Sequence, residues 1–313
     1  MLLFFAAALS LGFWYGYQIY YNPRPATMLV QFSISPKESA SSIISRLKSQ
    51  NLIRSEVALK VYLRLNNLTQ KLKPGGYEIS RDLTPERIID QLIKGPKDVW
   101  VTIPEGWRRE QIAARLSNSL KNFDPYEFQN LSVPYEGWLF PDTYLIPAGA
   151  TASDTLQIFL KNFSKKTGLN PVLTGDRRIL TLASLVEREA KSDPDRQIIA
   201  GILLKRLDNS WPLQVDASVQ YAAASKSCMA APVGECDWWP QIFDTKYPSF
   251  YNTYLYPGLP PGPICNPGLA SIKAVQTPQT SLYWYYITGS DGVTRYAENL
   301  SGHNLNIDKY LKP

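Results

Sequence analysis

One carboxylate on the apolar face of a predicted helix is well suited to acid–base chemistry. In the segment from 180 to 190, Leu182, Leu185, Val186 and Glu189 share one stripe, at spacings of three, four and seven residues. Apolar neighbours exclude water from a carboxylate and raise its pKa. A carboxylic acid that keeps its proton near neutral pH can protonate a glycosidic oxygen. Glu189 is therefore the predicted catalytic residue; the alternative is a side chain that only leaves the core for solvent.

Polar and aromatic side chains follow this helix in three clusters, at 212–221, 251–264 and 266–268, interleaved with stiff Pro-Gly turns. Sugars present hydroxyl groups in the ring plane and apolar C–H faces above it, and such side chains can contact both. The alternative is a proline-rich loop that only packs. The candidates for substrate binding are Gln214, Asp216, Ser218, Tyr251, Asn252 and Tyr254.

The composition is that of a globular protein with a basic balance. The chain has 313 residues, of which 19% are charged and 44% hydrophobic, and a formal net charge of +6. Its Lys and Arg residues are scattered and form no run typical of nucleic-acid binding. An anionic polymer outside the cytoplasm, or lipid headgroups, fits this balance better.

The sequence contains three cysteines and one histidine. Cys228 and Cys236 flank a short segment with Pro and Gly, so they can form a disulfide in an oxidising compartment, although other pairings with Cys265 stay open. His303 and the cysteine spacing match no common zinc pattern. We expect neither a metal ion nor a cofactor, and we find no Ser-His or Cys-His nucleophile motif.

The N-terminal segment predicts a membrane anchor. It carries no charge before Arg24, and aromatic residues cluster near its far end, as they do at a membrane interface. Roughly 20 apolar residues suffice to span a bilayer. A cleaved signal peptide is the alternative, but the segment lacks the usual basic start.

Hydrophobic periodicity predicts an α+β protein with two units after the anchor. Residues 1–22 are the expected transmembrane helix, 23–97 a small module in the order strand–helix–helix–strand–helix, and 98–313 a larger mixed α+β domain. Ser55 and the Thr84-Pro85 pair are expected to begin helices in the module. In the larger domain we predict helices at 109–116, 153–167, 177–191, 194–207 and 270–275, and strands at 99–103, 283–288 and 293–297.

Taken together, several motifs resemble the YceG-like (MltG) family of endolytic murein transglycosylases. They are Glu-Gly-Trp-Leu-Phe-Pro-Asp-Thr-Tyr at 136–144, Leu-Ala-Ser-Leu-Val-Glu-Arg-Glu at 182–189, Leu-Gln-Val-Asp-Ala-Ser-Val at 213–219, and Tyr-Asn-Thr-Tyr at 251–254 followed by Gly-Leu-Pro-Pro-Gly-Pro-Ile. The resemblance covers nearly the whole chain. It implies a LysM-like N-terminal module and a catalytic domain with a lysozyme-like helix, in which Glu189 is the acid.

The resemblance also implies a reaction. The chain is expected to cleave the β-1,4 bond between N-acetylmuramic acid (MurNAc) and N-acetylglucosamine in nascent peptidoglycan. The muramyl 6-hydroxyl would be the nucleophile and leave a 1,6-anhydro end, so a second catalytic carboxylate is not required. Asp216 would position substrate. The alternatives are a non-catalytic peptidoglycan-binding scaffold and a lysozyme-like muramidase.

The expected setting follows from the anchor and the substrate. We predict a single-pass protein of the inner (cytoplasmic) membrane, held by residues 2–21, with a periplasmic catalytic domain. Its expected partners are peptidoglycan glycan strands and peptidoglycan synthases, and no nucleic acid. The segment 225–247, with its two cysteines and Trp238-Trp239, departs from the family pattern. It either reshapes the groove or forms a stapled surface loop.

Overall fold

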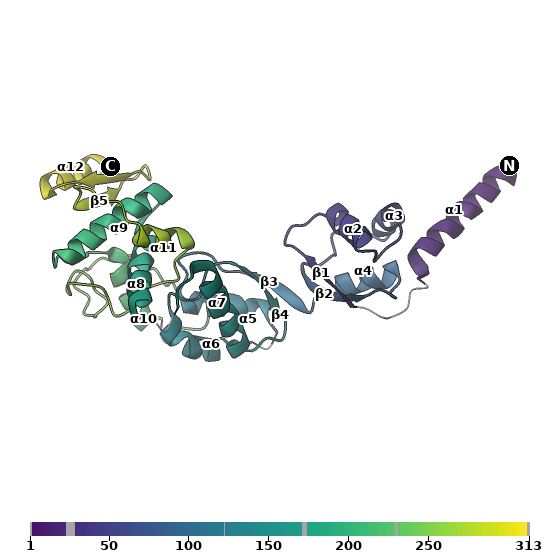
Figure 1. Ribbon diagram of the computed structural model, residues 1–313, viewed down its shortest axis with the longest axis horizontal. Coiled ribbons are helices and arrows are strands. Elements are labelled where there is room, and N and C mark those ends of the chain that lie inside the picture. Colours follow the sequence, from purple (N-terminus) through teal and green to yellow (C-terminus); the bar gives the residue numbers. More distant parts are fainter. Residues whose placement is uncertain (1, 23–28, 122, 171–173, 229–230, 312–313) are drawn as a thin grey trace. The chain divides into compact units, whose positions relative to one another are not determined.

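A computed structural model describes residues 2–22, 29–121, 123–170, 174–228 and 231–311 (Figure 1). The chain divides into two compact units. The first comprises Met1–Val101, Ser119–Lys121 and Thr143–Ala150, and the second Thr102–Asn118, Asn122–Asp142 and Thr151–Pro313. Each unit contains both helices and strands, so the predicted α+β class is confirmed.

The first unit is built on a four-stranded sheet in the order β1-β2-β3-β4. Its elements are α1 (Leu2–Tyr20), β1 (Leu29–Ile34), α2 (Ala40–Ser49), α3 (Glu56–Leu65), β2 (Gly75–Ser80), α4 (Pro85–Lys94), β3 (Asp98–Thr102) and β4 (Thr143–Pro147). Strands β1 and β2 are antiparallel, with Leu29 opposite Ser80 and Ile34 opposite Gly75. Strands β3 and β4, which follow the predicted boundary at residue 97, therefore complete the sheet of this unit.

Side-chain caps fix where the helices of the first unit begin. The Ser55 hydroxyl accepts a hydrogen bond from the Ala58 amide, and the Thr84 hydroxyl accepts one from the Arg87 amide. Pro85 follows Thr84 in the first turn of α4, where its missing N–H costs nothing. Both caps confirm the predicted starts, and they orient the apolar faces of α3 and α4 toward the core.

The predicted membrane anchor coincides with α1. The last turn of α1 packs on the first unit, where Ile19 is buried and the Tyr20 ring lies 6.4 Å from the ring of Tyr62. No helix among the described residues combines the length and the hydropathy of a membrane span, whereas the sequence predicts one over residues 1–22.

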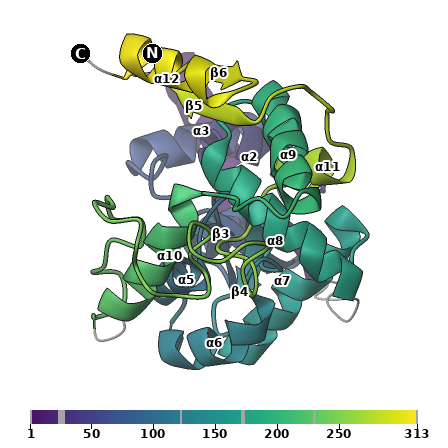
Figure 2. The ribbon, with the colours of Figure 1, turned by 90° about the vertical axis from the view of Figure 1, so that its left-hand side faces the viewer.

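The second unit packs its helices around α8. Its elements are α5 (Arg109–Ser119), α6 (Pro125–Ser132), the 3-10 turn η1 (Val133–Tyr135), α7 (Ala152–Thr167), α8 (Thr174–Glu189), α9 (Asp193–Asp208), α10 (Asp216–Ser227), α11 (Leu269–Gln276), β5 (Tyr285–Thr288), β6 (Thr294–Ala297) and α12 (Leu300–Tyr310). Helices α9, α10 and α11 all contact α8, which lies amid them in Figure 2. The antiparallel β5–β6 hairpin and α12 contact each other.

Candidate active site

Helix α8 is the buried element that carries the predicted catalytic residue. Leu182, Leu185 and Val186 are buried in the core of the second unit, which confirms the predicted apolar stripe. Ser184 is also buried, and its hydroxyl accepts a hydrogen bond from the Ile264 amide. Glu189 is the last residue of α8 and stays partly exposed. The core thus fixes the helix and leaves one carboxylate at its end.

Glu189 opens into a cavity of about 480 Å³. Gln214 and Asp216 line the cavity with it, as do Tyr285 and Tyr286 of β5. A further wall comes from α12, where Leu300, His303 and Ile307 share one face. One wall of the cavity is polar and carries the carboxylates, and the other consists of apolar and planar side chains. This combination suits a sugar, which has hydroxyl groups at its edges and apolar faces.

The surroundings of Glu189 favour its protonated form. Burial raises its pKa to about 7, and the nearby negative charge of Asp216 acts in the same direction. The Tyr286 hydroxyl opposes this shift by donating a 3.0 Å hydrogen bond to Oε2 of Glu189, and the charges of Arg206 and Arg188 oppose it more weakly. A carboxyl group with a pKa near neutrality can both give and take a proton at physiological pH.

Arg206 of α9 joins the two sides of this cavity. Its guanidinium is buried and donates hydrogen bonds to the backbone carbonyls of Leu213 and Trp284. Leu213 precedes Gln214, and Trp284 lies two residues before Tyr286. No ion pair between described side chains involves Arg206. Arg206 therefore fixes both backbone segments and places a positive charge near Glu189.

Gln214, Asp216 and Tyr254 are the predicted substrate residues that the structure brings near Glu189. Gln214 has a φ of 54°, in the left-handed region that non-glycine residues rarely adopt. Its backbone N–H donates a hydrogen bond to the Thr253 carbonyl. Asp216 begins α10 and accepts a 2.5 Å hydrogen bond from the Tyr254 hydroxyl. The first two of the predicted clusters thus meet at this contact.

The other three predicted substrate residues do not line the Glu189 cavity. Ser218 is fully buried, and its hydroxyl donates to the Val215 carbonyl. Asn252 is also buried, and its side-chain amide donates hydrogen bonds to the backbone carbonyls of Thr245 and Tyr247 in its own loop. Tyr251 lines a separate cavity, where its ring lies 4.7 Å from that of Tyr221.

Glu187, the other carboxylate of the Glu-Arg-Glu motif, binds neighbouring parts of the fold. It accepts hydrogen bonds from the Gly268 amide at 2.9 Å and the Ser271 hydroxyl at 2.7 Å. Its carboxylate also lies 3.6 Å from the Arg196 guanidinium. These contacts tie α8 to α9 and to the start of α11.

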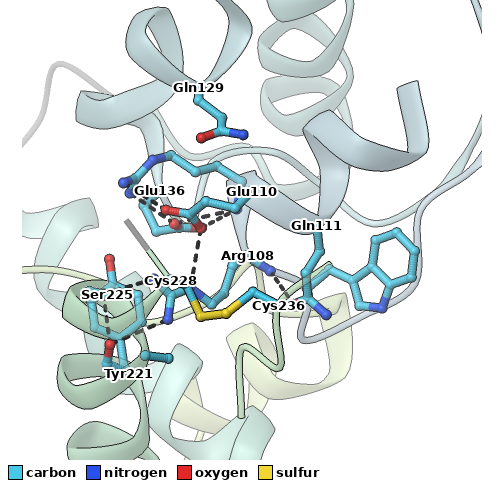
Figure 3. A network of polar contacts seen from close by, with 12 residues as sticks. Arg108, Glu110, Gln111, Gln129, Glu136, Tyr221, Ser225, Cys228 and Cys236 are labelled. Carbon is cyan, nitrogen blue, oxygen red and sulfur yellow. Dashed lines mark hydrogen bonds and ion pairs between the residues drawn. A yellow bond between two sulfur atoms is a disulfide. The ribbon is translucent and has the colours of Figure 1, made fainter. Parts of the chain in front are cut away.

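The segment 225–247 carries a disulfide and covers a buried polar network (Figure 3). Cys228 and Cys236 are bonded to each other, whereas Cys265 is a buried free thiol. The Arg108 guanidinium lies 4.0 Å from the ring centre of Tyr221 and 4.5 Å from that of Trp238. Both contacts are close enough for cation–π attraction.

The same segment reaches the end of helix α8. The Trp239 ring lies 3.9 Å from the guanidinium of Arg188, the residue before Glu189. The Trp239 indole N–H also donates to the Gln111 side chain on α5. Trp239 of this segment therefore contacts the residue next to the predicted acid.

Sequence reasoning missed Tyr286, Arg206 and the wall formed by α12. The strand containing Tyr286 was predicted, but its alternation alone does not indicate which helix end it faces. Arg206 reads as an ordinary charged residue in a helix. The one available signal was an isolated histidine among apolar residues at helical spacing near the C-terminus, with Leu300 and Ile307 on either side of His303.

Comparison with known proteins identifies the family. The model of the YceG-like family matches residues 32–309, so the chain belongs to this family. An endolytic murein transglycosylase of Bacillus subtilis is 28% identical over 316 residues, covering 90% of this chain and 85% of that protein. One of Streptococcus pneumoniae strain R6 is 27% identical over 99% of this chain, which spans only 64% of that protein. A crystal structure of a YceG-like protein from Listeria monocytogenes superposes with a TM-score of 0.54 at 26% identity, covering 89% of this chain and 99% of the other.

Proposed function

We propose that this YceG-like chain is a lytic transglycosylase that cuts the β-1,4 bond between MurNAc and N-acetylglucosamine in peptidoglycan strands and leaves 1,6-anhydro ends. The observation that carries the proposal is Glu189, whose pKa is raised to about 7 at the edge of a 480 Å³ cavity. The names of the relatives from B. subtilis and S. pneumoniae support the same activity.

In the proposed mechanism Glu189 acts twice. Protonated Glu189 donates its proton to the glycosidic oxygen as the bond to the anomeric carbon of MurNAc breaks. The resulting carboxylate then accepts the proton of the muramyl 6-hydroxyl as that oxygen bonds to the same carbon. The nucleophile belongs to the substrate, so its attack is intramolecular and gains from proximity. Glu189 ends the cycle protonated, ready for the next cut.

Asp216 and Gln214 are proposed to hold the substrate during this cycle. Asp216 is engaged by the Tyr254 hydroxyl, which leaves its second carboxylate oxygen for the oxocarbenium-like charge or a sugar hydroxyl. The strained backbone at Gln214 favours a functional side chain, because such strain persists mainly where the surroundings enforce it. Because Asp216 lines the same cavity as Glu189, a muramidase that hydrolyses the bond is the second candidate.

Product analysis tests the proposal and separates its alternatives. Full-length protein is incubated with purified peptidoglycan, and the glycan ends are identified by mass spectrometry. Anhydro ends that disappear with Glu189→Gln support the transglycosylase, and reducing MurNAc ends support the muramidase. Intact strands that still bind the protein support a scaffold and overturn the proposal.

We further propose that the chain works outside the cytoplasm, attached to the membrane through residues 2–21. Support comes from the Cys228–Cys236 disulfide, which suits an oxidising compartment, and from the absence of charged residues before Arg24. Such attachment would keep the enzyme near nascent strands and their synthases, and it would limit strand length. Fractionation of cells that express the full chain or a version lacking residues 1–22 tests this: loss of membrane association only in the truncated form is expected, and equal fractionation overturns it.

A further inference from the structure

A second cavity of about 310 Å³ lies in the second unit and shares no lining residue with the Glu189 cavity. Helices α8 and α10 contribute to both spaces. The residues that matter for its chemistry are Arg109, Glu136, Arg177, Tyr221, Tyr251 and Gly262. The cavity is thus a distinct hollow with cationic and aromatic walls.

The charges behind this cavity are already paired. Arg109 lies 2.8 Å from Glu110 and 3.3 Å from Glu136, and Arg108 lies 3.2 Å from Glu110. Figure 3 shows Glu110 and Glu136 side by side above Arg108. The Asn266 amide also donates to Glu136 at 2.8 Å. Two guanidinium groups and two carboxyl groups therefore pair with one another, away from Arg177.

Arg177 differs from these paired arginines. It lies near the start of α8 and is exposed, and no ion pair within the described part of the chain includes it. Gly262 makes room for it, since a Cβ at Gly262 would come within 2.9 Å of Nη2 of Arg177 and 3.6 Å of the Tyr251 hydroxyl. Arg177 therefore brings an unbalanced positive charge to a cavity with aromatic walls.

We propose that this cavity binds the stem peptide of the peptidoglycan strand, with the Arg177 guanidinium pairing with a peptide carboxylate. Guanidinium groups bind carboxylates through two parallel hydrogen bonds. The Tyr251 hydroxyl, which lines the same cavity, contributes a donor beside it. This inference rests on the proposed function, because it assigns to that reaction a preference for strands that carry peptides.

The separation between the two cavities matches the reach of such a peptide. Arg177 and Glu189 are twelve residues apart on α8, which is about 18 Å along the helix. On α10, Asp216 lines the first cavity and Ala222 the second, about 9 Å away along the helix. An extended peptide of five residues spans at most about 18 Å, so a stem of at least five residues is needed to cover the distance along α8. A muramyl residue at Glu189 could thus extend its peptide to Arg177.

The test compares two substrates and a matched pair of arginines. Glycan strands with intact stem peptides and strands stripped of peptides by an amidase are cleaved by wild type, Arg177→Ala and Arg178→Ala. Arg178 is the adjacent exposed arginine and does not line the cavity. For Arg177→Ala we expect the ratio of kcat/KM for peptide-bearing to stripped strands to fall about tenfold, mainly through KM, and for Arg178→Ala we expect the wild-type ratio. Gly262→Ala, which must displace the guanidinium, should lower the ratio as well.

An unchanged ratio in Arg177→Ala, or an equal fall in Arg178→Ala, overturns the inference. A binding measurement keeps the result independent of catalysis. The Glu189→Gln protein is titrated with a soluble muramyl peptide and with the same peptide carrying amidated carboxyl groups. If the Glu189→Gln protein binds the amidated peptide more weakly than the unmodified one, the peptide carboxylate contributes to binding. If the double variant Glu189→Gln/Arg177→Ala binds both peptides equally, that contribution comes from Arg177, and the site is supported even if no anhydro ends form. Anhydro ends without any preference for peptide-bearing strands would instead support the proposed function alone.

Discussion

The Tyr286 hydroxyl donates a 3.0 Å hydrogen bond to Oε2 of Glu189, although the two residues are 97 positions apart in the sequence. The bond stabilises the carboxylate form of Glu189 against the burial that favours its protonated form. Tyr286 is half-buried in β5 and lines the same cavity as Glu189. It sets both the orientation and the proton affinity of the proposed acid.

Replacement of Tyr286 by Phe should therefore change the pH profile of the reaction. Without the donor, the pKa of Glu189 rises, and the basic limb of the profile, near pH 7 in the wild type, moves to higher pH. We also expect kcat to fall on the order of tenfold, because the carboxyl group loses a hydrogen bond that orients it. Initial rates between pH 5 and 9 measure both effects. Tyr283→Phe is the control, since Tyr283 stacks on Tyr296 and does not line the cavity.

The raised pKa of Glu189 also links protein stability to pH. Between the ordinary carboxyl pKa of 4.5 and about 7, the folded protein binds a proton that the unfolded chain releases. The free energy of unfolding therefore falls as pH rises through this window. The wild type should lose about 3 kcal/mol of unfolding free energy between pH 4.5 and 8 through this group, and Glu189→Gln should remove that loss, as measured by denaturant unfolding at the two pH values. Burial also raises the pKa of Glu136 to about 7, so part of the wild-type slope should persist. An unchanged slope would contradict the assignment.

Arg206 should be more sensitive to substitution than an exposed arginine. Arg206→Ala leaves the carbonyls of Leu213 and Trp284 without their donor, and we expect a loss of about 3 kcal/mol in unfolding free energy. Arg206→Lys keeps the charge but loses the planar fork, so it should recover only part of the stability. Denaturant unfolding and kcat are measured for both, with Arg178→Ala as the exposed reference. Equal stability of Arg206→Ala and the reference would show that the two backbone segments do not depend on Arg206.

The disulfide should stabilise the loop that covers the polar network. Closing a loop of this length contributes about 2 kcal/mol by limiting the unfolded chain. Replacement of Cys228 and Cys236 by Ser should lower stability by this amount and increase the solvent exposure of Trp238 and Trp239. Tryptophan fluorescence and denaturant unfolding measure the change. A reducing agent should reproduce the change in the wild type and have no effect on the double variant, which keeps only Cys265. Equal stability of the double variant and the oxidised wild type would show that the disulfide does not stabilise the folded protein.

The sequence predicts helices and strands well where a few neighbouring residues determine them. Ser55 and the Thr84-Pro85 pair begin helices because their hydroxyl groups satisfy free amides, which is a property of a few adjacent residues. The stripe that ends at Glu189 was predictable because α8 is buried by its own apolar side chains. In contrast, the sequence does not predict α10 as a helix, since its small residues carry little apolar periodicity.

The contacts of the site were harder to predict because they depend on distant segments. Ser218 and Asn252 have the side chains of sugar-binding residues, yet both use their hydrogen bonds within nearby backbone. Short polar side chains often compete for backbone groups in turns, and sequence alone does not distinguish this use from ligand binding. Tyr286 and Arg206 could not be identified because their partners lie in other elements.

The burial of Cys265 has a consequence for how the chain acquires its disulfide. This thiol is fully buried under α8, where it donates to the Ser184 carbonyl, and burial raises its pKa well above the usual value. Only a thiolate attacks a disulfide, so the folded protein withholds its third sulfur from exchange. The order of events therefore matters: a chain that packs α8 before oxidation has two reactive sulfurs and one pairing, whereas a chain oxidised earlier can form three.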